Sequence, residues 1–152
     1  MRHGGFLDGG ILVLIFSMLI IGMGLQKTGA VALIADLISP SLQGLPPIVM
    51  LAAIYVLTSV MTEIVSNNAV AIVITPLAIS LADSIGVDAR PMVVAVMFGA
   101  SASFATPIGY QTNTLVYGAG NYKFSDFMKI GAPMNLIVGI ASILMIPVIF
   151  PF

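Results

Sequence analysis

Charge is scarce in this sequence. Only 7% of the 152 residues are charged, whereas 59% are apolar; soluble domains usually contain roughly 25% charged and 45–50% apolar residues. This composition excludes an ordinary soluble domain and indicates a chain whose partner is the lipid bilayer. The net charge of −1 provides no basic surface, so no nucleic acid partner is expected.

Cysteine is absent, and the one histidine, His3, lies near the start of the chain. The sequence therefore has no disulfide framework and no thiolate metal site. It shows no grouping of a nucleophile, a base and an orienting residue, so we predict that the protein is not an enzyme and uses no enzyme cofactor. No A-x-A-like cleavage site follows the opening MRHGGFLDGG, so a cleaved signal peptide is not expected.

Long uncharged runs are what the sequence has instead: Gly9–Leu25, Leu45–Thr62, Ile64–Ala82, Pro91–Tyr122 and Ile130–Phe152. Each is near or above the ~17–25 residues that cross a hydrocarbon core of ~30 Å. We therefore predict an all-α membrane protein of transmembrane helices, with one re-entrant helical hairpin and one unwound transmembrane helix. Its expected elements within 1–152 are a crossing at 9–25, an interfacial helix at 30–38, the re-entrant hairpin at 46–83, the broken crossing at 91–120 and a last crossing at 131–151.

The hairpin is predicted from the stretch TEIVSNNAVAIVITP at 62–76, which places polar residues between two apolar runs. A helix over about 47–65 meets SNN, and a second apolar helix follows over 69–82, bent at Pro76. Two helices joined by a polar tip can enter the membrane and return to the same face. The charged loop DSIGVDARP at 83–91 is expected in water.

A second break is predicted within SASFATPIGYQTNTLVYGAG at 101–120. Small residues, Pro107 and Gly109 precede a polar group of Gln111, Thr112 and Asn113, which indicates a helix that unwinds and restarts. The polar stretch NYKFSDFMK at 121–129 is expected at the interface, before the last crossing.

Both breaks place polar side chains at membrane depth, where they need partners. At a break, one half-helix directs carbonyl oxygens at the gap and the next directs N–H groups at it, so a cation and an anion can bind side by side. Hydroxyl and amide groups can serve both ligands. The alternative is hydrogen bonding between helices alone. The candidate substrate-binding residues are Ser66, Asn67, Asn68, Thr112 and Asn113.

Glu63 is the one acid inside an uncharged stretch, and ionisable residues in membranes are functional candidates. It allows three interpretations: a counter-charge for a cation, a proton-coupling group, or a structural acceptor for N–H groups at the hairpin tip. We favour the structural role, because an acid beside a bound anion would oppose its binding.

These motifs resemble the divalent anion/sodium symporter family, solute carrier family 13, within the ion transporter superfamily that includes citrate and arsenite permeases. In TEIVSNNA, Ser66 and Asn67 match the family's Ser-Asn-Thr tip motif, and Asn68 replaces the threonine. The segment ATPIGYQTNTLVYGAG at 105–120 is similar to the family's unwound helix. The resemblance covers essentially the whole chain and is to the carboxyl-terminal half of the permease, one repeat of an inverted-repeat transporter.

The resemblance implies sodium-coupled symport of a dianion, a di- or tricarboxylate or sulfate, by an elevator-like motion. It implies Na+ as the coupling ion, bound by Ser66, Asn67, Thr106, Pro107, Gly109 and Asn113. Because Asn68 replaces the threonine of the family motif, the motif does not specify which dianion is the substrate. A proton-coupled or antiport member of the superfamily, and a membrane subunit that only packs against a partner, are the alternatives.

The family has two inverted halves that share one site, and this sequence shows one hairpin and no internal repeat. We expect a piece of a longer permease first, and otherwise a chain that assembles with a separate amino-terminal half or with an inverted copy of itself. The expected location is a cell membrane of the bacterial inner type, crossed several times.

Overall fold

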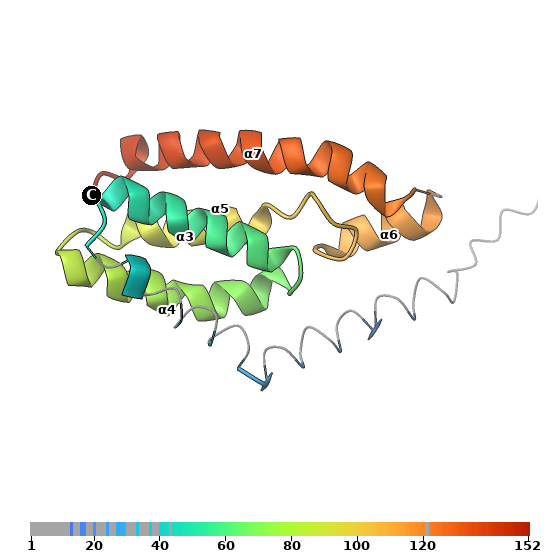
Figure 1. The fold of residues 1–152 in the computed structure, drawn as a ribbon, viewed down its shortest axis with the longest axis horizontal. Coiled ribbons are helices and arrows are strands. Elements are labelled where there is room, and N and C mark those ends of the chain that lie inside the picture. Colours follow the sequence, from blue (N-terminus) through green and yellow to red (C-terminus); the bar gives the residue numbers. More distant parts are fainter. Residues whose placement is uncertain are drawn as a thin grey trace, which may run out of the picture.

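A computed structural model describes residues 44–120 and 122–152, together with scattered positions between 13 and 42. The two continuous stretches form five α-helices and contain no strand (Figure 1): α3 (Pro47–Thr62), α4 (Asn67–Ile85), α5 (Arg90–Ser101), α6 (Gln111–Ala119) and α7 (Phe124–Ile149). Over these residues the all-α prediction is confirmed. The crossing predicted at 9–25 and the interfacial helix predicted at 30–38 lie outside the continuously described residues.

The helices pack around α3 and α5. Each of these two contacts the other and also contacts α4 and α7. In Figure 1, α7 runs along one side of the bundle and α4 along the opposite side, while α6 lies near the beginning of α7. The core is formed by fully buried apolar side chains of α3, α4 and α5: Met50, Leu51, Ile54, Val70, Ile74, Met92 and Val96.

A glycine sets the distance between α3 and α5. A Cβ added at Gly99 would lie 2.9 Å from the Tyr55 carbonyl oxygen and 3.0 Å from Thr58 Cβ. The two helices therefore approach so closely that a larger residue would force a shift. This close approach lies in the last turn of α5, which ends at Ser101.

The hairpin helices begin and end close to where the sequence places them. Pro47 occupies the first helical position of α3, where its missing N–H costs nothing. Gly86 ends α4 in the left-handed conformation, with a φ of 71°. The helix α4 continues through Pro76, and it starts at Asn67, directly after a tip of four residues at 63–66.

The last helix begins earlier than the crossing expected from 131. It starts at Phe124, so most of the polar stretch predicted as an interfacial segment is helical. The Lys123 N–H donates to Asp126 Oδ2 at 2.9 Å, and this acid in the first turn favours helix initiation. The capping interaction explains why the helix starts among polar residues.

Two of the described helices, α4 and α7, are long and apolar enough to cross a membrane, by length and composition. The helices α3 and α5 are also apolar but have 16 and 12 residues. Much of the outer side of α7 is apolar and exposed, including Leu136, Ile137, Leu144 and Val148. These are the properties of a membrane protein.

Candidate functional site

The turn between α3 and α4 brings Glu63 to the end of α3. Its backbone N–H still bonds to the helix, donating to the Val60 carbonyl at 3.3 Å, and the chain then turns so that Ser66 precedes α4. Ser66 makes no side-chain cap on α4, although serine is a favoured capping residue. The Asn67 Oδ1 atom accepts from the Asn68 N–H at 3.0 Å.

Glu63 is 9% exposed, and its carboxylate accepts hydrogen bonds from the segment between α5 and α6. Its Oε2 accepts from the Thr106 N–H at 2.8 Å, and its Oε1 accepts from the Ala105 N–H at 2.9 Å. The Ser103 hydroxyl lies 3.5 Å from Oε2. The tip of the hairpin is therefore bonded directly to the segment between α5 and α6, about forty residues further along the chain.

That segment, residues 102–110, is not helical and is hereafter the break segment. Two hydroxyls of α3 donate to backbone carbonyls where α5 ends and the break segment begins. Ser59 Oγ donates to the Ala102 carbonyl at 3.1 Å, and Thr62 Oγ1 donates to the Ala100 carbonyl at 2.9 Å. Because non-helical backbone in a membrane must find partners within the protein, these hydroxyls stabilise the break against α3.

Thr106 links the tip and the break segment a second time. Its hydroxyl donates to the Glu63 carbonyl at 2.9 Å and accepts from the Gly109 N–H at 3.0 Å. A Cβ at Gly109 would collide with Ser103 Oγ and lie 3.1 Å from the Thr62 carbonyl oxygen. A larger residue at this point would therefore force Ser103 to move.

The beginning of α6 closes the break segment from its other end. The Asn113 amide donates to the Ser103 carbonyl at 2.8 Å and to the Thr106 carbonyl at 3.1 Å. The buried Thr114 hydroxyl donates to the Pro107 carbonyl at 2.7 Å. The break is thus a defined loop whose polar groups are bonded to α3 and α6.

A third element, α7, also contacts the break segment. The Asn135 amide donates to Glu63 Oε1 at 2.7 Å, and its Oδ1 accepts from the Phe104 N–H at 3.4 Å. A Cβ at Gly131, one turn earlier, would collide with the Phe104 carbonyl. The helix therefore lies directly against the backbone of the break.

The predicted site residues fall into two groups. Glu63, Thr106, Gly109 and Asn113 are joined by the hydrogen bonds described above, and Pro107 lies between them in the break segment, where its carbonyl accepts from Thr114. The other group is bonded to none of these: Ser66 and Asn67 are half-buried, while Asn68 and Thr112 are exposed. Within the described part of the chain, the side chains of Ser66, Asn68 and Thr112 make no hydrogen bond.

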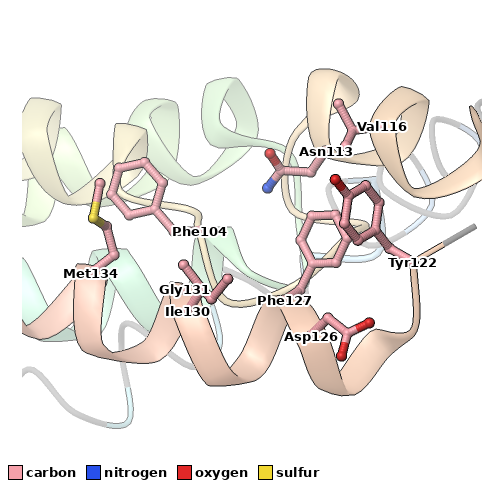
Figure 2. Close-up of a pocket in the computed structure, with 9 residues that line it drawn as sticks. All are labelled: Phe104, Asn113, Val116, Tyr122, Asp126, Phe127, Ile130, Gly131 and Met134. Atoms are coloured by element: carbon pink, nitrogen blue, oxygen red, sulfur yellow. The ribbon is translucent and has the colours of Figure 1, made fainter. Parts of the chain in front are cut away.

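Two cavities adjoin this region. One, of about 320 Å³, lies between α6 and α7; Figure 2 shows Asn113 and Val116 of α6 on one side of it and side chains of α7, including Phe127, on the other. A groove of about 510 Å³ follows α3 and α7 and includes Glu63, Thr106 and Asn135. Both are lined mainly by apolar side chains.

Sequence reasoning missed five polar residues of the site: Ser59, Thr62, Ser103, Thr114 and Asn135. Ser59 and Thr62 are three residues apart and so share one face of α3, a signal that could have been read. Asn135 is an isolated polar residue in a long apolar run, which is the same kind of signal that identified Glu63.

No three residues of the types His, Cys, Asp and Glu come together in the described ranges. A cation site built from these parts would use neutral oxygens of the backbone, of hydroxyls and of amides. That choice of ligands suits an alkali cation, because thiolates and imidazoles serve softer metals.

Apolar helices packed around a polar break are typical of membrane transporters. A family described as "Citrate transporter" matches residues 7–99, more than half of the chain. The chain therefore belongs to the citrate transporter family, which confirms the resemblance to these permeases and the prediction that the protein is not an enzyme. The break segment, α6 and α7 lie beyond the matched range.

Individual relatives agree with this family. The chain is 41% identical to the Uncharacterized transporter YfbS of Escherichia coli over 141 residues, 93% of this chain and 23% of that protein. It is 40% identical to the Probable sodium/sulfate cotransporter 3 of Chlamydomonas reinhardtii over 119 residues, 76% of this chain and 13% of that protein. The Sodium/sulfate cotransporter 1 of the same alga is 41% identical over 57% of this chain and 10% of its own length. The chain thus spans less than a quarter of these relatives.

Proposed function

We propose that this chain is part of a sodium-coupled symporter for a divalent anion, either a di- or tricarboxylate or sulfate. Two relatives are named sodium/sulfate cotransporters, which supports sodium as the coupling ion and sulfate as a candidate substrate. The family is named for citrate, which supports a tricarboxylate as the other candidate. The relatives are more than four times longer than the matched region, which supports a transporter completed by a further half. We place it in a cell membrane, crossed several times.

The observation that carries the proposal is the bonding between the two breaks. Glu63 and Thr106 join the tip of the hairpin to the break segment through three hydrogen bonds of 2.8 to 2.9 Å. A protein that only needed helix packing could have used apolar residues here, because each buried polar group must be matched. A pair of bonded helix breaks provides carbonyls and N–H groups beside each other, as mid-membrane sites of transporters require.

We further propose a division of ligands at this site. The N-terminus of α4, with its free Ser66 and Asn68 side chains and with Asn67, offers donors to the dianion. The break segment around Thr106, Pro107 and Gly109, with Asn113, offers oxygens to sodium. Thr112 would face the anion from α6.

The hairpin 46–83 is proposed to be re-entrant. At ~1.5 Å per residue the 16 residues of α3 reach about 24 Å, less than the ~30 Å of a hydrocarbon core. The same reasoning supports an unwound transmembrane helix made of α5, the break segment and α6, since α5 alone would reach only about 18 Å.

Glu63 is proposed to be structural rather than a proton carrier. Its two carboxylate oxygens accept from two backbone N–H groups and from the Asn135 amide. These donors use the carboxylate as an acceptor that ties the hairpin tip to the break segment and to α7, which is a structural role. Proton-coupled transport is the alternative, and the uptake experiment below distinguishes the two.

The test is uptake of labelled succinate, citrate and sulfate into vesicles that contain the assembled transporter. We expect uptake of one of these anions under an inward sodium gradient, loss of uptake with a sodium ionophore, and no loss with a protonophore. Uptake that follows the proton gradient would instead establish the proton-coupled alternative.

Glu63→Gln separates the roles of the carboxylate. As a structural change it removes one acceptor and is expected to abolish uptake under both gradients. If Glu63 carried the coupled proton, the amide would imitate the protonated form and anion exchange would persist without its pH dependence. Normal uptake after apolar replacement of the tip residues would identify a packing subunit.

A further inference from the structure

Asn135 lies in the middle of α7, 72 residues from Glu63 in the sequence. Its side-chain amide makes two hydrogen bonds, one as a donor and one as an acceptor. The Nδ2 atom donates to Glu63 Oε1 at 2.7 Å, and the Oδ1 atom accepts from the Phe104 N–H at 3.4 Å. One side chain of α7 therefore touches both the end of α3 and the break segment.

Together, Asn135 and Glu63 hold three consecutive N–H groups. Phe104 donates to Asn135, while Ala105 and Thr106 donate to the two oxygens of Glu63. Peptide planes whose N–H groups are fixed also have fixed carbonyl directions. The carbonyls fixed in this way are those of Ser103, Phe104 and Ala105, and the first of them also accepts from the Asn113 amide.

The packing of α7 supports the same arrangement independently of the amide. Gly131 lies one turn before Asn135 on the same face, and a Cβ there would collide with the Phe104 carbonyl and with Ala105 Cα. The backbone of the break segment is thus clamped between Glu63 and α7, at the residue just before the proposed sodium ligands begin.

We infer that Asn135 is a positioning residue of the transport site: from α7 it orients the Glu63 carboxylate and the backbone at 104–106. The part that concerns sodium rests on the proposed function. Asn135 does not touch the ion. It acts through Glu63 and Thr106, so its loss changes how well the ion is held rather than how well the protein inserts.

The first test needs no transport. Asn135→Leu keeps the branched shape of the side chain but removes both hydrogen bonds, and it is compared with Leu136→Ala, a neighbouring change at a residue that is 65% exposed. In the purified chain in detergent, hydrogen exchange of the amides at 104–106 is expected to speed up about tenfold in Asn135→Leu, with α4 unchanged. Unchanged exchange at 104–106, or an equal rise throughout the chain, would overturn the inference.

A reversal of donor and acceptor tests whether Asn135 acts through Glu63. Asn135→Asp alone places two carboxylates together and is expected to speed exchange at 104–106 further. Adding Glu63→Gln lets an amide at 63 donate to a carboxylate at 135, so exchange in the double variant should be slower than the sum of the two single effects predicts. Additive effects of Asn135→Asp and Glu63→Gln would show that the two side chains are not coupled.

The second test uses the assembled transporter and measures anion uptake against sodium concentration. In Asn135→Leu the sodium concentration for half-maximal uptake is expected to rise about tenfold, while the maximal rate per inserted molecule stays within about twofold. A lower maximal rate with an unchanged half-maximal concentration would indicate a merely structural role. Absence of sodium-driven uptake in the unaltered protein would refute the proposed function, and the exchange measurements would still decide the role of Asn135.

Discussion

The polar side chains Ser66 and Asn67, where α4 begins, differ from Thr106 and Asn113 in what they bind. Thr106 and Asn113 make hydrogen bonds to backbone atoms of the tip and of the break segment. Ser66 makes no side-chain bond within the described residues, and Asn67 accepts only from its neighbour Asn68. Side chains that stabilise nothing in the protein are available to a ligand.

At the residue scale we therefore predict that Ser66→Ala and Asn67→Ala each abolish anion uptake and leave membrane insertion intact. Neither change removes a bond that holds the described fold, so the free energy of unfolding should change by less than about 1 kcal/mol. Uptake in vesicles and the amount of inserted protein are measured together.

Ser84→Ala is the matched control. It is the same substitution as Ser66→Ala but near the opposite end of α4, where the hydroxyl donates to the Leu81 carbonyl at 2.7 Å. This variant should transport normally. Normal rates in Ser66→Ala and Asn67→Ala would contradict the assignment of the tip to ligand binding.

The sequence located Glu63 but not its partners. An acid in an apolar run is visible by inspection, and so is the polar tip that follows it. Its donors at 105, 106 and 135 lie 42 to 72 residues away, and no local pattern states which turn of which helix will face it. The Asn135 contact depends on the register of α7 against α3, which packing decides.

At the element scale, α7 and the break segment meet through glycine. We predict that Gly131→Ala destabilises the protein by roughly 1–3 kcal/mol, because the added methyl group collides with backbone that cannot move aside. Thermal unfolding in detergent is the measurement. The same variant should speed hydrogen exchange at 104–106.

Gly139→Ala provides the comparison on the same helix. A Cβ there would lie 3.1 Å from a ring carbon of Tyr55, and alanine is about 1 kcal/mol better than glycine inside a helix. The ring can give way slightly, so the two effects should nearly cancel. Equal losses of thermal stability in Gly131→Ala and Gly139→Ala would show that the contact with Phe104 contributes nothing beyond ordinary helix packing.

Elements were predictable to different degrees. Apolar runs and the Pro and Gly residues indicated the helices α3, α4 and α5 and the break after α5. The start of α7 was not indicated, because a polar stretch was interpreted as interfacial although Asp126 caps a helix within it. A polar stretch can still begin a helix where a side chain caps it, and here the capping by Asp126 explains why α7 begins at Phe124.

At the scale of the whole molecule, the continuously described residues supply one hairpin tip and one break. Alternating access in inverted-repeat transporters needs a site between two repeats. We predict that the chain, reconstituted alone, inserts as helices but gives no sodium-driven uptake of succinate, citrate or sulfate. Circular dichroism and vesicle uptake measure the two parts of this prediction.

Co-expression with an amino-terminal half that carries a first hairpin should restore uptake. The same half paired with the Asn67→Ala chain is the control and should remain inactive. Robust uptake by the isolated chain would refute the prediction and would point to two oppositely oriented copies as the working unit.

The bond between Asn135 and Glu63 joins residues that are synthesised far apart in time. A chain is made and inserted from its amino terminus, so the hairpin and the break segment leave the ribosome well before residue 135 does. Until then, Glu63 Oε1 and the Phe104 N–H lack their partner on α7. Before α7 enters the membrane, Glu63 alone can hold the backbone at 105 and 106, and the support of the Phe104 N–H is added only when α7 packs against the break segment.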